Sequence, residues 1–93
     1  MKSLRLQVIS EVGLHARPAA EFVKQAGRFQ SGIQVRNASK NTAWVDAKSI
    51  LSVLTLGVEK GHDIELKAEG MDEETAVQSL RTLIESDFNG MFA

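Results

Sequence analysis

Cysteine is absent from this chain of 93 residues, and that absence excludes several kinds of chemistry. Without thiols there is no disulfide framework, no thiolate nucleophile and no zinc–thiolate site. A cysteine-free chain fits a reducing compartment, so we expect a cytoplasmic protein that is stabilised by packing. At this length, with 43% hydrophobic residues, the chain is predicted to form one domain over residues 1–93.

An excess of one charge and a long hydrophobic run are also missing. The formal net charge is −1, so the composition does not suggest a basic surface for nucleic acid or for lipid headgroups. No window approaches the roughly 18 apolar residues of a membrane-spanning helix, and residues 1–6 simply alternate. Repeats and low-complexity segments are absent. We therefore expect no nucleic-acid partner and no membrane insertion.

Strands are predicted where apolar and polar residues alternate, because a period of two is typical of a strand with one buried face. Three segments have this pattern: Leu4–Val8, Gly32–Arg36 and Asp63–Glu69. The polar turn Asn37–Asn41 precedes Thr42–Val45, which we expect to complete a hairpin with the second segment. Within it, Trp44 is expected to be packed or to lie at an edge rather than to stack on a ligand.

Helices are predicted where apolar residues recur at spacings of three and four. The first helix has Pro18 in its first turn, and a short second helix runs from Ser49 to Leu56 and stops at Gly57. The last helix is expected to begin at Asp72, as its cap, with Glu73 and Glu74 in the first turn. The apolar stripes of the first and last helices are Ala19, Phe22, Val23, Ala26 and Phe29, and Ala76, Val77, Leu80, Leu83, Ile84 and Phe88.

The predicted order is strand, helix, strand, strand, short helix, strand, helix. Each strand has one face that needs cover, and the two longer helices can supply it. We therefore expect an α+β fold in which a mixed or antiparallel sheet carries its helices on one face.

The stretch Gly13–Ala20, "GLHARPAA", places one of only two histidines at the expected start of the first helix. Unpaired backbone N–H groups and the helix dipole stabilise an anion at such a position. An imidazole nitrogen can also act as a nucleophile and form a covalent intermediate. If His15 accepts a phosphoryl group, the adduct is itself an anion that the helix end can hold.

Arg17 adds a guanidinium whose forked donors match phosphate oxygens, and Pro18 fixes the backbone that carries it. The chain has no Walker loop, no carboxylate cluster for a metal near this site and no recognisable serine–histidine–acid arrangement, so we expect no metal and no cofactor. The residues alone leave a second interpretation open. His15 is then only a capping or surface histidine, and Arg17 a solvated charge.

Two stretches together resemble the histidine-containing phosphocarrier family, HPr, of the bacterial phosphoenolpyruvate-dependent phosphotransferase system. "GLHARPAA" looks like the active-site signature of this family. Asp46–Gly57, "DAKSILSVLTLG", resembles its second signature, which contains a serine that a dedicated kinase phosphorylates in some bacteria. The resemblance covers almost the whole chain except the tail Asn89–Ala93. It implies an open-faced sandwich, with a four-stranded antiparallel sheet and three helices on one face.

The resemblance also implies a role for each residue of the first signature. His15 accepts a phosphoryl group on Nδ1 from the phosphorylated first enzyme of the system and passes it to sugar-specific enzyme IIA acceptors. Arg17 orients and neutralises the group, and the backbone N–H groups of Ala16 and Arg17 bind it. Such a protein is a carrier between enzymes rather than an enzyme, and we expect it to be a monomer.

A docking face for these partners is expected on the first two helices. Arg17, Ala20 and Lys24 follow at spacings of three and four and form one exposed ridge. In the short helix Val53 and Leu56 are the expected core positions, which leaves an apolar patch of Ile50, Leu51 and Leu54. The alternative, that all five apolar side chains are core, stays open on the sequence alone.

Ser49 lies at the start of the short helix, where a serine can cap the helix and can also be phosphorylated. Regulation would add a serine kinase/phosphorylase and a transcription regulator as partners. Ser52 stands where many family members have glycine, which bears on recognition by the kinase, and Val12 stands where many have a polar residue. The Asn37–Asn41 turn looks longer than in most members. His62 is expected to be a solvated loop residue.

Two other classes of function remain to be compared with the carrier. A purely regulatory binding protein would act through Ser49, but relatives of that sort tend to lack the histidine that stands here at position 15. The sequence contains no metal cluster and no second catalytic group that would support a free-standing enzyme. The branch served by a carrier, whether sugar uptake, nitrogen-linked regulation or a dihydroxyacetone kinase, is not specified by the sequence.

Overall fold

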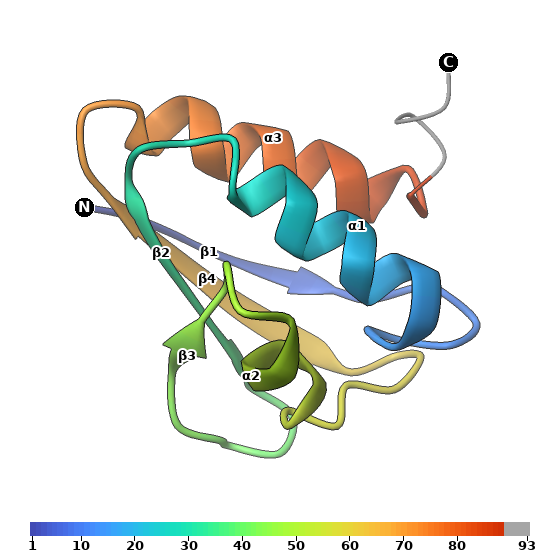
Figure 1. Cartoon of the computed structure of the whole chain (residues 1–93). Coiled ribbons are helices and arrows are strands. Elements are labelled where there is room, and N and C mark those ends of the chain that lie inside the picture. The colour runs from blue at the N-terminus through green and yellow to red at the C-terminus, as the bar shows by residue number, and fades with distance from the viewer. Residues whose placement is uncertain (89–93) are drawn as a thin grey trace.

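The computed structural model describes residues 1–88, so the tail Asn89–Ala93 lies outside the described residues. Four strands form one sheet in the order β1-β4-β2-β3, with every neighbouring pair antiparallel. Three helices lie on one face of this sheet (Figure 1). The elements in chain order are β1 (Lys2–Gln7), α1 (Ala16–Ala26), β2 (Gly32–Asn37), β3 (Val45–Asp46), α2 (Ile50–Leu54), β4 (Asp63–Glu69) and α3 (Glu73–Glu85). The α+β prediction and the antiparallel option are confirmed.

The two faces of the sheet differ as the alternating pattern requires. On the helix side, Leu6 of β1 pairs with Ile64 of β4, and Leu66 pairs with Val35 of β2, and these side chains are buried in the core. All apolar positions of the predicted α3 stripe are buried as well.

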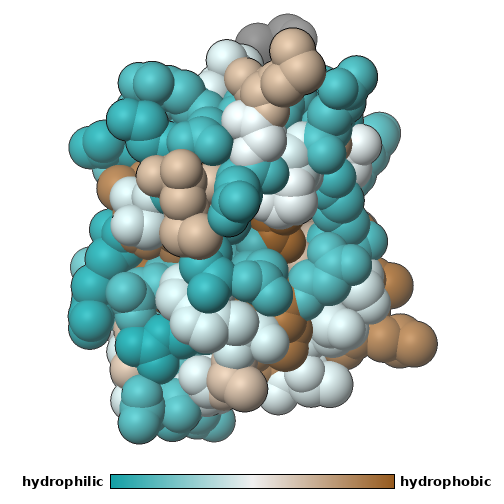
Figure 2. Space-filling model, turned by 90° about the vertical axis from the view of Figure 1, so that its left-hand side faces the viewer, coloured by the Kyte–Doolittle hydropathy of each residue, from teal (hydrophilic) through white to brown (hydrophobic). Residues whose placement is uncertain are grey.

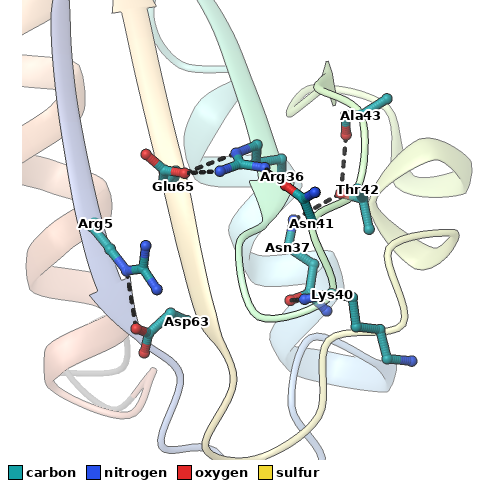
Figure 3. A network of polar contacts seen from close by, with 9 residues as sticks. All are labelled: Arg5, Arg36, Asn37, Lys40, Asn41, Thr42, Ala43, Asp63 and Glu65. Atoms are coloured by element: carbon teal, nitrogen blue, oxygen red, sulfur yellow. Dashed lines mark hydrogen bonds and ion pairs between the residues drawn. The ribbon is translucent and has the colours of Figure 1, made fainter.

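The opposite face of the sheet is polar and carries ion pairs across the strands (Figure 3). Arg5 Nε lies 3.0 Å from Asp63 Oδ2, and Arg36 Nη2 lies 2.5 Å from Glu65 Oε1. Trp44 covers part of this face, with Lys67 Nζ 4.2 Å from its ring centroid, so its predicted place as a packed or edge residue is confirmed. The helices therefore cover one side of the sheet only.

The predicted second arm of the hairpin is too long. Thr42–Val45 was expected to be a strand, but β3 contains only Val45 and Asp46. The reason is that Thr42 closes the turn: its N–H donates to the carbonyl of Asn37, and its hydroxyl accepts from the Asn37 N–H. With these groups used in the turn, pairing with β2 begins only at Val45.

Two helices end earlier than their apolar stripes predict. Phe29 is not in α1, which ends at Ala26 and is capped by Gly27, although the ring of Phe29 still packs against the core. Phe88 likewise lies after the end of α3. Its backbone is in the left-handed region, with φ +63°, and its side chain is buried. Periodicity identified both side chains as core correctly, but a buried side chain does not require that the helix continue.

The capping prediction is right for Ser49 and wrong for Asp72. Ser49 caps a helix shorter than the predicted Ser49–Leu56, because α2 ends at Leu54 and the chain then turns through Gly57 at φ +59°. Asp72 precedes α3, but its carboxylate makes no capping hydrogen bond. It accepts instead from the N–H groups of Gln30 and Ser31, at 2.9 Å each, and from the Ser31 hydroxyl.

These hydrogen bonds, that of the Ser31 hydroxyl first, hold the pKa of Asp72 below its usual range. The carboxylate thus joins the start of α3 to the loop that follows α1. A long-range contact of this kind has no signature in the local sequence.

His62 is not the solvated loop residue that was expected. It is half-buried, and its Nδ1 lies 3.0 Å from the N–H of Glu59 and 3.2 Å from Asn37 Nδ2. Asn37 itself is fully buried and donates to the carbonyl of Leu56. The two side chains therefore join the end of β2 to the loop between α2 and β4.

The surface that carries the N-terminus is mainly hydrophilic, with scattered hydrophobic groups, some of which project from it (Figure 2). Among residues 1–88, no helix is both long enough and apolar enough to cross a lipid bilayer.

Candidate functional site

The loop between β1 and α1 is fastened to the loop before β4, and this fixes the position of His15. The N–H of Leu14 donates to the carbonyl of Val58 at 3.0 Å, and the Leu14 side chain is fully buried. Gly13 has φ +64°, and a Cβ at this position would lie 2.0 Å from the Val58 oxygen. Only glycine fits this close approach, so the glycine of the first signature has a structural reason.

His15 is the residue directly before α1, in extended conformation with φ −127° and ψ 169°. His15 is the N-cap residue of α1, but its side chain makes no capping hydrogen bond, so the capping part of the alternative interpretation applies to the backbone only. The ring is instead 35% exposed, and its Nε2 lies 3.1 Å from Glu59 Oε2. This contact engages the Nε2 atom of the ring.

The backbone changes direction sharply between His15 and α1. Ala16 has φ +52°, in the left-handed region that is unfavourable for a residue with a side chain. Such a conformation costs about 1–3 kcal/mol and persists only where the surroundings enforce it. Here the buried side chains of Leu14 and Pro18 anchor the chain on both sides. Pro18 lies in the first turn, as predicted.

Arg17 is exposed in the first turn of α1, two residues from His15. It borders an open hollow of about 320 Å³. The residues that line this hollow are Ser10, Glu11, Val12, Ala16, Arg17, Pro18 and Asp87. Glu11, which lines the hollow, accepts a hydrogen bond from Lys60 Nζ at 2.7 Å, and this bond raises the pKa of Lys60. The unusual Val12 exposes an apolar side chain here.

The two parts of the predicted docking face lie on neighbouring helices, since α1 packs against α2. Arg17, Ala20 and Lys24 are all exposed along α1. On α2 the exposed fractions are 38% for Ile50, 74% for Leu51 and 38% for Leu54. Val53 and Leu56 are buried. The predicted division of this helix between core and surface is therefore confirmed, and the alternative that all five are core is wrong.

Ser49 is half-buried at the N-cap of α2, and its hydroxyl oxygen accepts from the N–H of Ser52 at 3.3 Å. Ser52, which differs from the family pattern, thus contacts the capping serine through its backbone N–H. A capping bond made by the backbone N–H is unaffected by the side chain at position 52.

Glu59 is the site residue that sequence reasoning missed. It lies 44 positions from His15 and outside both signatures, so no spacing connects the two. Only the pairing of the two loops brings the carboxylate to the imidazole. A group of three or more side chains suited to hold a metal ion is not found within residues 1–88.

Comparison with known proteins identifies the class. A family model described as "PTS HPr component phosphorylation site" matches residues 2–86. The phosphocarrier protein HPr of Pseudomonas aeruginosa is 40% identical over 89 residues, which cover 96% of this chain and 97% of that protein. A crystal structure of HPr-C-His from Thermoanaerobacter tengcongensis has a TM-score of 0.89 at 46% identity and covers 95% of this chain and 96% of that one.

A multiphosphoryl transfer protein of Vibrio cholerae is 44% identical over 72 residues, 77% of this chain, but the match spans only 18% of that longer protein. The fold is thus that of a phosphocarrier of the phosphotransferase system. The chain belongs to the PTS HPr component family. Another structure of the Thermoanaerobacter tengcongensis protein is described as a dimer (TM-score 0.74).

Proposed function

We propose that this protein accepts a phosphoryl group on His15 Nδ1 from the phosphorylated first enzyme of the phosphotransferase system and passes it to sugar-specific enzyme IIA acceptors. The observation that carries this proposal is the exposed ring of His15 at the start of α1, in a chain that matches a family model described as a phosphorylation site. In the transfer, the Nδ1 lone pair attacks phosphorus. The bond between phosphorus and the donor atom breaks, and the donor atom keeps that electron pair.

The neighbours of His15 supply weak, open binding for the phosphoryl group. The N–H groups of Ala16 and Arg17 are at the positive end of α1, and the Arg17 guanidinium neutralises the added charge. Pro18 holds the backbone that carries them. A carrier must release the group again, so an exposed site suits it better than a deep cage, which would trap the phosphoryl form. The protein acts as a covalent intermediate between enzymes and needs no cofactor.

Docking of both partners is assigned to the apolar patch of Ile50, Leu51 and Leu54 together with the exposed ridge of α1. An apolar patch with a rim of Arg17 and Lys24 suits acidic partner surfaces and rapid, transient exchange. Small Ala20 allows a partner backbone to approach closely. We assign the whole chain, residues 1–93, to one domain that works as a cytoplasmic monomer.

Ser49 is the proposed regulatory site within this docking face. A phosphoryl group there carries a charge of about −1.5 to −2. It would be tolerated at the start of α2 but would repel acidic partners. A serine kinase/phosphorylase would control the modification, and a transcription regulator would read it.

The proposed function is tested by incubation of the chain with phosphoenolpyruvate and the first enzyme of the system. We expect one added phosphoryl group by mass, labile in acid, on the wild type and none on His15→Ala. Absence of the adduct on the wild-type chain would refute the carrier function.

The role of Arg17 is tested by the rate of the same reaction. In Arg17→Glu a carboxylate replaces the cation, so transfer should slow at least tenfold, about 1.4 kcal/mol in the barrier. An unchanged rate would show that Arg17 does not contact the phosphoryl group.

A further inference from the structure

A carboxylate outside both signatures contacts the proposed phosphorylation site. Glu59 Oε2 lies 3.1 Å from His15 Nε2, within hydrogen-bond distance. An ionised carboxylate can only accept, so the hydrogen in this contact belongs to the imidazole. A neutral imidazole carries one N–H, and a proton fixed on Nε2 leaves the lone pair on Nδ1.

The backbone of Glu59 is held in place from both sides. Its N–H donates to His62 Nδ1 at 3.0 Å, and its carbonyl accepts from the N–H of His62 at 3.0 Å. On the other side, the carbonyl of Val58 accepts from the N–H of Leu14. The backbone contacts between the two loops therefore set the distance between Glu59 and His15. Only the side chain of Glu59 has to become ordered for its carboxylate to reach the imidazole.

We propose that Glu59 is a positioning residue for phosphoryl transfer, which holds His15 as the Nε2–H tautomer so that Nδ1 is the nucleophile. The proposal rests on the proposed function of His15. When the Nδ1–phosphorus bond forms, the proton stays on Nε2 and the ring becomes cationic. The Glu59 carboxylate then faces that cation. Before transfer, the contact therefore favours the Nε2–H tautomer. After transfer, it stabilises the positive charge of the ring.

The openness of the site sets the size of the effect. The side chain of His15 is 35% exposed and that of Glu59 is 61% exposed, so water competes for the contact. Exposed pairs of this kind shift an equilibrium by about two- to fivefold. Glu59 therefore biases the tautomer instead of locking it.

A merely docking role for Glu59 makes different predictions. Glu59 precedes β4, in the loop that follows α2, so a partner bound at α2 could contact it directly. Loss of a docking contact raises the KM of the first enzyme for this chain and leaves the maximal rate and the tautomer unchanged. Loss of a positioning contact lowers the maximal rate and changes the tautomer even when no partner is present.

The tautomer is measured directly by ¹⁵N NMR of the isolated full-length chain, in which ring nitrogens with and without a proton have distinct shifts. With only two histidines the spectrum is simple, and His62 is an internal reference. Its Nδ1 accepts a hydrogen bond from the backbone N–H of Glu59, and substitution of the Glu59 side chain does not remove that N–H. At about pH 8.5, where an ordinary imidazole is neutral, we expect His15 to be predominantly Nε2–H. In Glu59→Ala the ratio of Nε2–H to Nδ1–H should fall about two- to fivefold.

Glu59→Gln separates geometry from charge. Its amide oxygen still accepts from Nε2, so the tautomer should stay close to that of the wild type, while the negative charge is lost. The maximal rate of phosphorylation by the first enzyme should fall about two- to fivefold in Glu59→Ala and by less in Glu59→Gln. Glu74→Gln, with the same charge change on an exposed side chain near the start of α3 (Figure 1), is the matched control and should behave as the wild type.

Failure of this proposal is distinguishable from failure of the carrier function. An identical tautomer ratio in the wild type and Glu59→Ala overturns the positioning role, even if His15 is phosphorylated normally. A rise in KM alone, with an unchanged maximal rate, also overturns it and assigns Glu59 to docking. A wild-type chain that takes no phosphoryl group refutes the carrier function, whatever the spectrum shows.

Discussion

At the residue scale, the position of His15 depends on contacts of its neighbours more than on its own. Gly13 allows the chain to pass against the Val58 carbonyl, and buried Leu14 fixes the next position. Ala16 then accepts an unfavourable φ of +52° so that the chain can enter α1. The half-buried His15 side chain therefore extends from a backbone that is held on both sides.

Substitution of Gly13 by alanine tests this dependence. A Cβ would have to displace the Val58 carbonyl, so Gly13→Ala should destabilise the fold by more than the about 1–2 kcal/mol that a left-handed conformation alone costs. Gly61→Ala is the matched control, because Gly61 also has a positive φ but a Cβ there would meet nothing within 4 Å. Urea unfolding of both variants gives the comparison. An equal decrease in the free energy of unfolding for the two variants would show that the close approach to Val58 adds no cost of its own.

At the element scale, the short helix α2 has two tasks that compete for the same residues. Five residues cannot form a stable helix alone, so α2 depends on buried Val53 and on the cap by Ser49. Its exposed face carries the apolar side chains assigned to docking. A modification at Ser49 therefore changes the helix start and the docking face together.

Two substitutions of Ser49 separate these tasks. Ser49→Ala removes the acceptor for the Ser52 N–H and should cost about 1 kcal/mol in the free energy of unfolding. Ser49→Asp keeps an acceptor and should be nearly as stable as the wild type, yet its charge should raise the KM of the first enzyme for this chain. Denaturant unfolding and transfer kinetics on the same samples test both statements. A Ser49→Asp chain with unchanged transfer kinetics would contradict the regulatory assignment.

At the scale of the whole molecule, side chains far apart in the sequence connect the loops at both ends of the helical layer. The Asn37 and His62 side chains connect β2 with the loop before β4. At the other end the Asp72 carboxylate joins the loop after α1 to the start of α3. The stability of this second connection depends on the ionised form of Asp72, because its pKa is lowered by the groups that donate to it.

Acidification tests the connection through Asp72. A group whose pKa is lower in the folded state adds stability above its ordinary pKa of about 3.9, and this is lost as the pH falls through the folded-state value. Asp72→Asn should therefore be less stable than the wild type near neutral pH, and the difference in Tm should shrink below about pH 4. Glu74→Gln, with the same charge change on α3, should show a smaller difference. A difference in Tm between the wild type and Asp72→Asn that is as large at pH 2 as at neutral pH would contradict the prediction.

The sequence by itself determined the order of the elements and most of the core, and it pointed to His15 as the candidate site. Periodicity predicted β1, β2, β4, α1 and α3, and the sequence also separated Val53 and Leu56 from the exposed side chains of α2 and placed His15 at a helix start, because these features depend on neighbours within a turn or two. Errors occurred where particular side-chain hydrogen bonds decide the outcome, either within one turn or between distant segments. β3 is short because Thr42 closes a turn, and the Asp72 carboxylate binds another loop in place of its own helix.

Only the tertiary structure decided which groups surround His15. Its contact with Glu59 and that of His62 with Asn37 have no local signal, since each joins segments that are far apart in the sequence. The hydrogen bond between Glu59 and His15 exists because Leu14 pairs with Val58, a contact between segments 44 residues apart. The sequence therefore points to His15 as the candidate site, whereas only the loop pairing shows that its Nε2 contacts Glu59.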